Sequence, residues 1–187
     1  MTNIAVVGTS GNKKNENNNL LSKAIFDSMV NETKQLISNY CRDKSKITLI
    51  SGGSAWADHI AVILFLNGEC GNLKLHFPCE WNNNEFSDAK VVNWIYNPGG
   101  TLNYYHNNFS NIMGYNTLTD ISNALNKGAI YTISKGFHAR NSLIAESDYL
   151  IAFTWSKTSQ PDDGGTMDTW KKFKGSNKIH IGLEKYL

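Results

Sequence analysis

Residues 136–155 read GFHARNSLIAESDYLIAFTW, and residues 161–166 read PDDGGT. Together they are typical of a short helix, a buried strand over 148–154 and a glycine turn that opens another helix. The second helix would begin at Gly164, Gly165 and Thr166. Helix N-termini present unpaired backbone N–H groups, so both helix starts are suited to bind an anion.

Three polar side chains lie at the start of the first of these helices, namely His138, Arg140 and Asn141. An arginine beside two helix N-termini supplies the counter-charge that a phosphate needs. For Arg140, a structural ion pair with Glu146 or Asp148 remains an alternative. For His138, helix capping or simple hydrogen bonding is an alternative to acid–base chemistry.

The composition is that of one folded domain spanning residues 1–187. The 18 basic and 16 acidic residues give a net charge of +2, which is too balanced for the clustered charge of a nucleic-acid-binding surface. No apolar run reaches the ~18 residues that a membrane span needs, and no signal peptide precedes the first strand. We therefore expect a cytoplasmic protein with neither a membrane nor a nucleic-acid partner.

The three cysteines, Cys41, Cys70 and Cys79, are scattered and show no CxxC or Cys/His spacing. Such spacing marks zinc sites, so we expect no metal and no cofactor. Reduced thiols are the expected state in a cytosolic protein.

Continuous apolar runs alternate with segments of helical spacing along the chain. Such runs are typical of parallel strands that are buried on both faces. We expect strands at 3–8, 46–51, 73–78, 129–133, 148–154 and 178–182. Right-handed crossovers between them give an α/β fold, a doubly wound, mostly parallel, Rossmann-like sheet.

Residues 80–117 interrupt this alternation with an aromatic-rich insertion. Its aromatic residues are scattered among Asn and Gly, and Pro98-Gly99-Gly100 is typical of a turn. We expect irregular structure that lies over the binding edge. The insertion ends at Thr117-Leu118-Thr119-Asp120, which has the spacing of a capping box. The insertion aromatics and Trp155 would stack on a base, or would simply belong to the core.

Ligands of doubly wound sheets bind beyond the carboxyl ends of the strands. Two glycine turns follow strands there, Gly8-Thr9-Ser10-Gly11 and Ser51-Gly52-Gly53-Ser54. Glycines let the backbone approach a phosphate or a ribose closely. Ordinary turn chemistry remains the alternative for each turn, because neither completes a known phosphate-binding motif.

Carboxylates flank the predicted edge. Asp162, Asp163 and Asp168 surround the last glycine turn, and Asp58 lies about one turn into the second helix. Asp168 would act as a general base or hold a ribose diol, or would be placed there by the helix dipole alone. Asp58 would point back at the edge, or would form a solvent-facing pair with His59.

Four short motifs resemble those of the SLOG superfamily of Rossmann-like nucleotide-binding proteins. Val7–Gly11 and Leu49–Asp58 resemble its two N-terminal motifs, the second being nearest to the SGGxxxAD helix of the DprA-like and YspA-like branches. Phe137–Asn141 and Gly164–Thr166 are similar to the MHxRK and PGGxGT motifs of the LOG branch, which contains phosphoribohydrolases. The resemblance implies a nucleotide or nucleotide-derived small molecule as ligand, and a homo-oligomer.

The resemblance leaves three functions in competition. A non-catalytic binder or sensor is favoured because the catalytic glutamate of the LOG branch falls on Thr169, which has no carboxylate. An N-glycosidic phosphoribohydrolase or transferase acting on nucleoside monophosphates would use Arg140 and Asp168 as catalytic residues. A DprA-like single-stranded DNA binder is disfavoured by the net charge.

Overall fold

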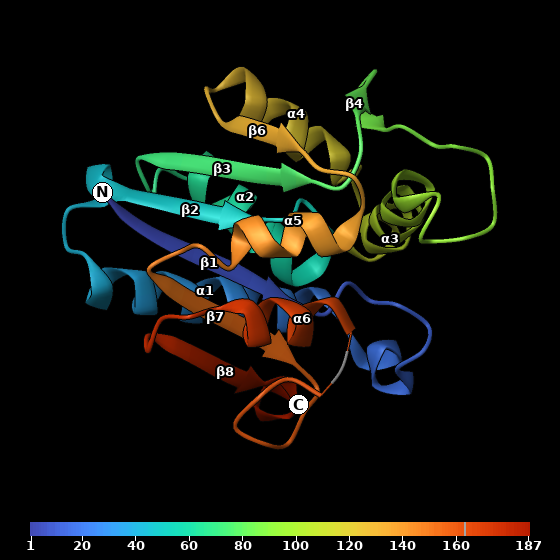
Figure 1. The fold of residues 1–187 in the computed structure, drawn as a ribbon. Coiled ribbons are helices and arrows are strands. Elements are labelled where there is room, and N and C mark those ends of the chain that lie inside the picture. Colours follow the sequence, from blue (N-terminus) through green and yellow to red (C-terminus); the bar gives the residue numbers. More distant parts are fainter. Residues whose placement is uncertain (163) are drawn as a thin grey trace.

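The computed structural model describes residues 1–162 and 164–187. Its centre is a six-stranded sheet in the order β6-β3-β2-β1-β7-β8, in which each neighbouring pair is parallel. The strands are β1 (Thr2–Gly8), β2 (Ile47–Ser51), β3 (Asn72–Phe77), β6 (Ile130–Ile133), β7 (Tyr149–Thr154) and β8 (Lys178–Gly182). All six arrows run the same way in Figure 1, so the carboxyl ends meet at one edge. The predicted α/β fold is confirmed.

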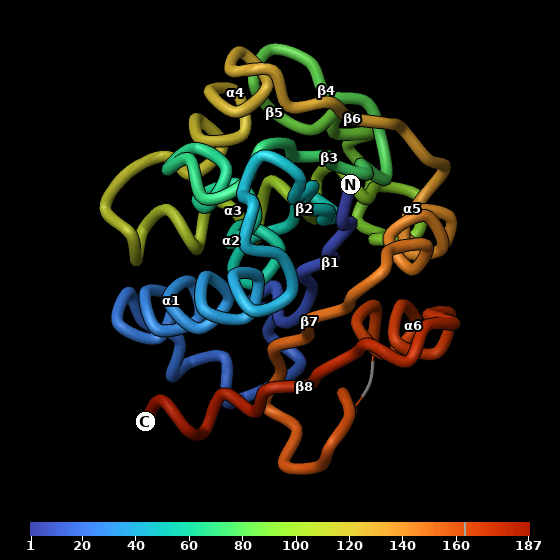
Figure 2. Tube along the Cα trace, turned by 90° about the vertical axis from the view of Figure 1, so that its left-hand side faces the viewer, coloured from blue at the N-terminus to red at the C-terminus, as the bar shows by residue number. Residues whose placement is uncertain are grey.

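Helices cover both faces of the sheet (Figure 2). One layer contains α1 (Lys23–Tyr40), α2 (His59–Leu66) and α4 (Leu118–Asn126), and the other contains α5 (Phe137–Ile144) and α6 (Gly164–Lys172). From β1 the chain adds β2, β3 and β6 on one side and then crosses over to add β7 and β8 on the other. The winding direction therefore changes between β1 and β7, which we call the switch point. Among the described residues, no helix has the length and apolar character needed to cross a bilayer.

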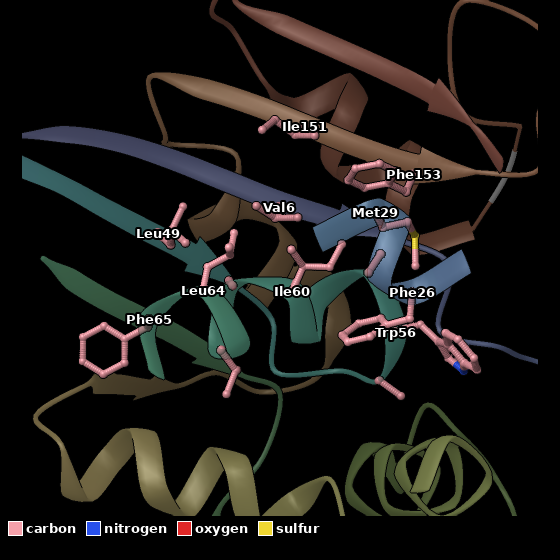
Figure 3. Close-up of a cluster of buried hydrophobic side chains, with 14 of the residues drawn as sticks. Val6, Phe26, Met29, Leu49, Trp56, Ile60, Leu64, Phe65, Ile151 and Phe153 are labelled. Carbon is pink, nitrogen blue, oxygen red and sulfur yellow. The ribbon is translucent and has the colours of Figure 1, made fainter. Parts of the chain in front are cut away.

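Strand β1 contributes to both layers of the core, as its continuous apolar run predicts. Ile4 and Val6 belong to the larger cluster, whereas Ala5 and Val7 belong to a smaller cluster with residues of α5 and α6. This alternation follows from the two-residue period of a strand. In the larger cluster, strand residues such as Val6 and Ile151 lie close to Met29 of α1 and Ile60 of α2 (Figure 3).

The insertion is more regular than expected. It forms a short hairpin of β4 (Trp81–Asn82) and β5 (Glu85–Phe86), followed by the long helix α3 (Pro98–Met113). The prediction of a turn at Pro98-Gly99-Gly100 is wrong, because these residues are the first turn of α3. Proline suits this position since its missing N–H would lack a helical partner anyway, and Asn97 caps the helix by accepting the Gly100 N–H at 2.9 Å.

The predicted capping box at residues 117–120 is also wrong. Thr117 precedes α4 but makes no side-chain capping bond. Its hydroxyl lies 2.9 Å from His106 Nδ1 and 3.0 Å from the Ser110 hydroxyl. The Asp120 carboxylate instead accepts hydrogen bonds from His59 and Tyr115. Tertiary partners on α2 and α3 have therefore taken the groups that would have capped the helix.

Candidate functional site

Three side chains connect the ends of β1 and β2 with the starts of α5 and α6. The Thr166 hydroxyl donates to the Gly8 carbonyl at 3.0 Å, and Arg140 Nη1 donates to the Gly52 carbonyl at 3.4 Å. The Asn141 amide donates to the Gly165 carbonyl at 3.3 Å. The structure thus brings four of the segments singled out in the sequence together at the carboxyl edge. Asp163 lies outside the described residues.

Arg140 is a buried charge paired with Asp58. Its Nη1 lies 3.9 Å from Asp58 Oδ2, and its Nε and Nη2 donate to Asn141 Oδ1 at 3.2 and 2.9 Å. The alternative of a structural ion pair named the wrong partners, Glu146 or Asp148, because Arg140 is paired with Asp58. Asp148 instead accepts the Asn3 N–H at 2.8 Å. Burial lowers the pKa of Arg140 and raises that of Asp58, while each charge opposes the shift of the other.

Asp58 points back at the edge, and the alternative of a solvent-facing pair with His59 is wrong because both residues are buried. The Asp58 carboxylate accepts the N–H groups of Gly52 at 3.1 Å and Ser54 at 3.3 Å. The Gly53 N–H donates to the Ser51 hydroxyl at 3.3 Å. A carboxylate of the protein therefore occupies the place that we expected for a phosphate, and a ligand would have to compete with it.

The glycines of the edge divide into two kinds. A Cβ at Gly8 would overlap the Phe153 carbonyl, and one at Gly52 would lie 2.6 Å from the Arg140 guanidinium carbon. Close protein packing therefore explains these two glycines without a ligand. A Cβ at Gly165 would meet only the Asn141 amide nitrogen, at 3.6 Å. The start of α6 is thus a glycine segment where the structure leaves room for a ligand, and so is Gly136 before α5, where a Cβ would meet nothing within 4 Å.

Asp168 is held ionised beside the start of α6. Its Oδ2 accepts hydrogen bonds from Lys172 at 2.8 Å, Asn141 at 3.0 Å and His138 at 3.2 Å. Burial alone would raise the pKa of Asp168, but these bonds outweigh it and lower the pKa. A carboxylate in this state can accept hydrogen bonds from hydroxyls, but it cannot donate a proton at neutral pH. The His138 side chain remains largely exposed.

A small hydrogen-bond network holds the turn after β1. The Thr9 hydroxyl donates to Asn18 Oδ1 at 2.8 Å and accepts the Gly11 N–H at 3.2 Å. Trp155 donates its indole N–H to the same Asn18 oxygen at 2.9 Å. Trp155 is only 3% exposed, so the hypothesis that it stacks on a base is corrected and the core alternative holds. Asn18 lies in the short 3-10 helix Glu16–Leu20, and its polar surroundings in the sequence do not indicate this contact with Trp155.

A cavity of about 630 Å³ lies beside this turn, and we call it the edge cavity. It is lined by Asn12–Lys14, which directly follow the turn, by the insertion loop and by the first turns of α3. The lining includes three lysines and three aromatic residues, namely Lys13, Lys14, Lys90, Trp94, Tyr104 and Tyr105. Among the described residues of this lining, Asp88 is the one acidic residue, and it is paired with Lys90 at 3.1 Å.

The edge cavity is connected to the predicted segments on two sides. Tyr105 of α3 lines the cavity together with Asn12, the residue that directly follows the turn after β1. The Trp94 ring lies 6.1 Å from that of Phe137, the first residue of α5, and the Arg140 guanidinium lies 5.0 Å from the same Phe137 ring. The insertion therefore reaches from the turn after β1 to the start of α5, as the prediction of an aromatic cover over the edge requires.

A second cavity, of about 640 Å³, is lined by Glu85 of β5, the later part of α3, Gly114–Asn116 and Leu118, and it contains none of the predicted ligand-binding residues. Within the described residues, no group of three or more His, Cys, Asp or Glu side chains could hold a metal ion.

Comparison with known proteins finds a viral relative. "Uncharacterized protein R261" of Acanthamoeba polyphaga mimivirus is 41% identical over 187 residues, which cover 98% of this chain and 97% of the relative. This chain belongs to the family of that mimivirus protein. The identity extends over nearly the whole of both chains, so the insertion lies within the aligned region. No protein-family model matches the sequence, and no solved structure matches it.

Proposed function

We propose that this chain binds a nucleotide or a nucleotide-derived small molecule at the carboxyl edge, as a SLOG-like binder or sensor. The observation that carries the proposal is the edge cavity, a basic and aromatic hollow lined in part by Asn12–Lys14, which follow the turn after β1. Ligands of doubly wound sheets bind beyond the carboxyl ends of the strands, where this turn lies. Lysine ammonium groups attract phosphates, and exposed aromatic rings stack on bases.

In this proposal, separate groups bind the separate parts of the ligand. A phosphate would lie at the start of α6, where Gly165 leaves room and the helix dipole favours negative charge. The ionised Asp168 would accept hydrogen bonds from ribose hydroxyls. Trp94 and Tyr104, which are 46% and 41% exposed, would cover the base in the edge cavity. Arg140 would act on the phosphate only through the electrostatic field of its guanidinium, because Asp58 and Asn141 already bind that group.

Binding is favoured over glycosidic hydrolysis by two observations. Thr169, at the position of the LOG-branch glutamate, is buried and donates its hydroxyl to the Gly165 carbonyl at 3.1 Å. Asp168 has a lowered pKa and three donors on one oxygen, so it is unsuited to protonate a leaving base. Neither side chain supplies the general acid that cleavage requires.

The test combines mass spectrometry of small molecules that co-purify with the protein and calorimetric titration with nucleoside mono-, di- and triphosphates. Lys13→Ala and Lys14→Ala should each weaken binding by about tenfold, the equivalent of ~1.4 kcal/mol for one charge-assisted contact. Lys46→Ala is the matched control, because Lys46 is exposed and precedes β2 at the opposite edge of the sheet. Binding that is equally strong in all three variants would refute the proposed site. Release of free base from a nucleoside monophosphate would refute the proposal of a non-catalytic binder and favour an N-glycosidic hydrolase.

A further inference from the structure

Strand β6 forms an open edge of the sheet. It is the end strand of the six-stranded sheet, at the top of that sheet in Figure 1, and among the described residues no strand pairs with its outer side. Three of its four residues are large, apolar and exposed, with Ile130 at 60%, Tyr131 at 42% and Ile133 at 43%. An exposed apolar edge strand is a template for pairing with another chain, so proteins normally cover it or place charges on it.

The opposite edge is better protected. Strand β8 begins with the exposed charge of Lys178, and its remaining residues are at least half-buried. His180 lies 2.8 Å from the Thr154 hydroxyl and 3.0 Å from the Thr158 carbonyl, so the loop after β7 packs against this strand. Strand β6 has no charged residue. The nearby Lys127 donates to the carbonyls of Phe65 and Leu66, and these bonds hold its ammonium group away from β6.

The hydrogen bonds of β6 show which backbone groups face outward. The Ser134 N–H donates to the Phe77 carbonyl at 2.8 Å, on the β3 side. Backbone groups alternate in direction along a strand, so Thr132 also faces β3, whereas the N–H and C=O groups of Tyr131 and Ile133 face away from it. These four outward groups are spaced as antiparallel pairing of two strands requires.

We propose that β6 pairs antiparallel with β6 of a second copy of this chain, about a two-fold axis at Thr132. In this register Tyr131 exchanges both backbone bonds with Ile133 of the second copy, and Ile133 does so with Tyr131. The strand is complementary to itself, as a two-fold interface requires. This inference does not depend on the proposed function.

The side chains fit the same register. Tyr131 and Ile133 are paired with Leu75 and Phe77 of β3, which places both on the face of the larger core. Each tyrosine would therefore lie beside an isoleucine of the other copy, and aromatic and β-branched residues are favourable cross-strand partners. Thr132 would face Thr132 across the axis, with each hydroxyl already hydrogen-bonded to His76 Nδ1 at 2.6 Å. No like charges would stand opposite each other within the four residues.

Sedimentation of the wild-type chain should give the mass of a dimer. Ile133→Pro removes an N–H that faces outward, so the pairing with β3 should remain while the dimer dissociates. The expected result is half of the dimer mass with an unchanged circular dichroism spectrum. A wild-type monomer, or a folded Ile133→Pro variant that remains a dimer, would overturn the proposal.

A cysteine variant tests the register of the proposed β6 pairing. It also tests the dimer itself if Ile133→Pro does not fold. Residues at a non-hydrogen-bonded antiparallel position have Cα atoms about 4.5 Å apart, within the range of a disulfide. Thr132→Cys should therefore form a covalent dimer under mild oxidation. Val92→Cys is the matched control, because Val92 is fully exposed but lies outside β6. Equal cross-linking of the two variants, or none in Thr132→Cys, would overturn the register.

Discussion

Replacement of Arg140 by alanine should destabilise the fold strongly, because Arg140 is the counter-charge of a buried carboxylate. Asp58 is 4% exposed and Arg140 is 8% exposed, with 3.9 Å between their charged groups. Removal of one partner from a buried ion pair costs about 3–5 kcal/mol, because the other charge remains buried and uncompensated. Arg140 also donates to the Gly52 carbonyl, so the variant loses a link between the end of β2 and α5.

Equilibrium unfolding in urea, followed by tryptophan fluorescence, measures this cost. The exposed pair of Lys23 and Asp27 on α1 provides the control, and Lys23→Ala should cost only about 0.3–0.5 kcal/mol. Adding Asp58→Asn to Arg140→Ala should recover part of the loss, since the uncompensated charge is then removed. An Arg140→Ala variant whose free energy of unfolding lies within about 1 kcal/mol of wild type would refute the reasoning.

The pH dependence of Arg140→Ala gives a second check. Burial already raises the pKa of Asp58, and loss of the guanidinium raises it further. The folded variant then binds a proton more readily than the unfolded chain, so its stability should fall as pH rises above the unfolded carboxyl value of about 4. The difference between variant and wild type should therefore be smaller at pH 5 than at pH 8. A difference that is constant with pH would mean that the cost is one of packing alone.

Three further predictions concern the scaffold. Burial lowers the pKa of His76 to about 4 and of His106 to about 3. Because the unfolded chain binds more protons than the folded one below about pH 6.5, the free energy of unfolding should fall by about 2 kcal/mol per ring from pH 7 to pH 5. A free energy of unfolding in urea that does not change over this pH range would contradict this. Trp155→Phe should cost about 1 kcal/mol through loss of the bond to Asn18, measured by the same assay, and no cost would mean that the bond contributes nothing. Gly8→Ala should cost more than about 2 kcal/mol, because its methyl group would overlap the Phe153 carbonyl, and a stable variant would show that the strand ends can separate.

The scaffold was predictable from the sequence because its signals are local. Continuous apolar runs such as Asn3–Gly8 show burial on both faces without knowledge of any neighbour. The contacts of the site are not local. Whether the Gly52 and Ser54 N–H groups meet a ligand or Asp58 depends on how a short helical turn folds back on the loop. The exposure of β6 could not be predicted either, because it depends on the order of the strands.

The insertion shows a different limit. Residues 98–113 contain two glycines and several asparagines, which disfavour a helix by intrinsic propensity. The helix is stabilised instead by its cap at Asn97 and by packing of Leu102 and Phe109 into the larger core. Propensity was overridden by tertiary contacts, and the three lysines of the edge cavity come together only once this helix is in place.

The buried pair of Arg140 and Asp58 constrains where a ligand's charge can be met. A cation that already neutralises a carboxylate contributes little net charge to a phosphate, which applies to Arg140 beside Asp58 and to Lys90 beside Asp88. The positive charge must therefore come from Lys13, Lys14 and the start of α6. Structural and binding roles are then separated among different residues. Arg140→Ala should lower stability by several times the effect of Lys23→Ala, whereas Lys13→Ala and Lys14→Ala should lower nucleotide affinity with little effect on stability. Melting curves taken with and without nucleotide distinguish the two, and an Arg140→Ala variant that is stable but fails to bind would place the phosphate on the arginine after all.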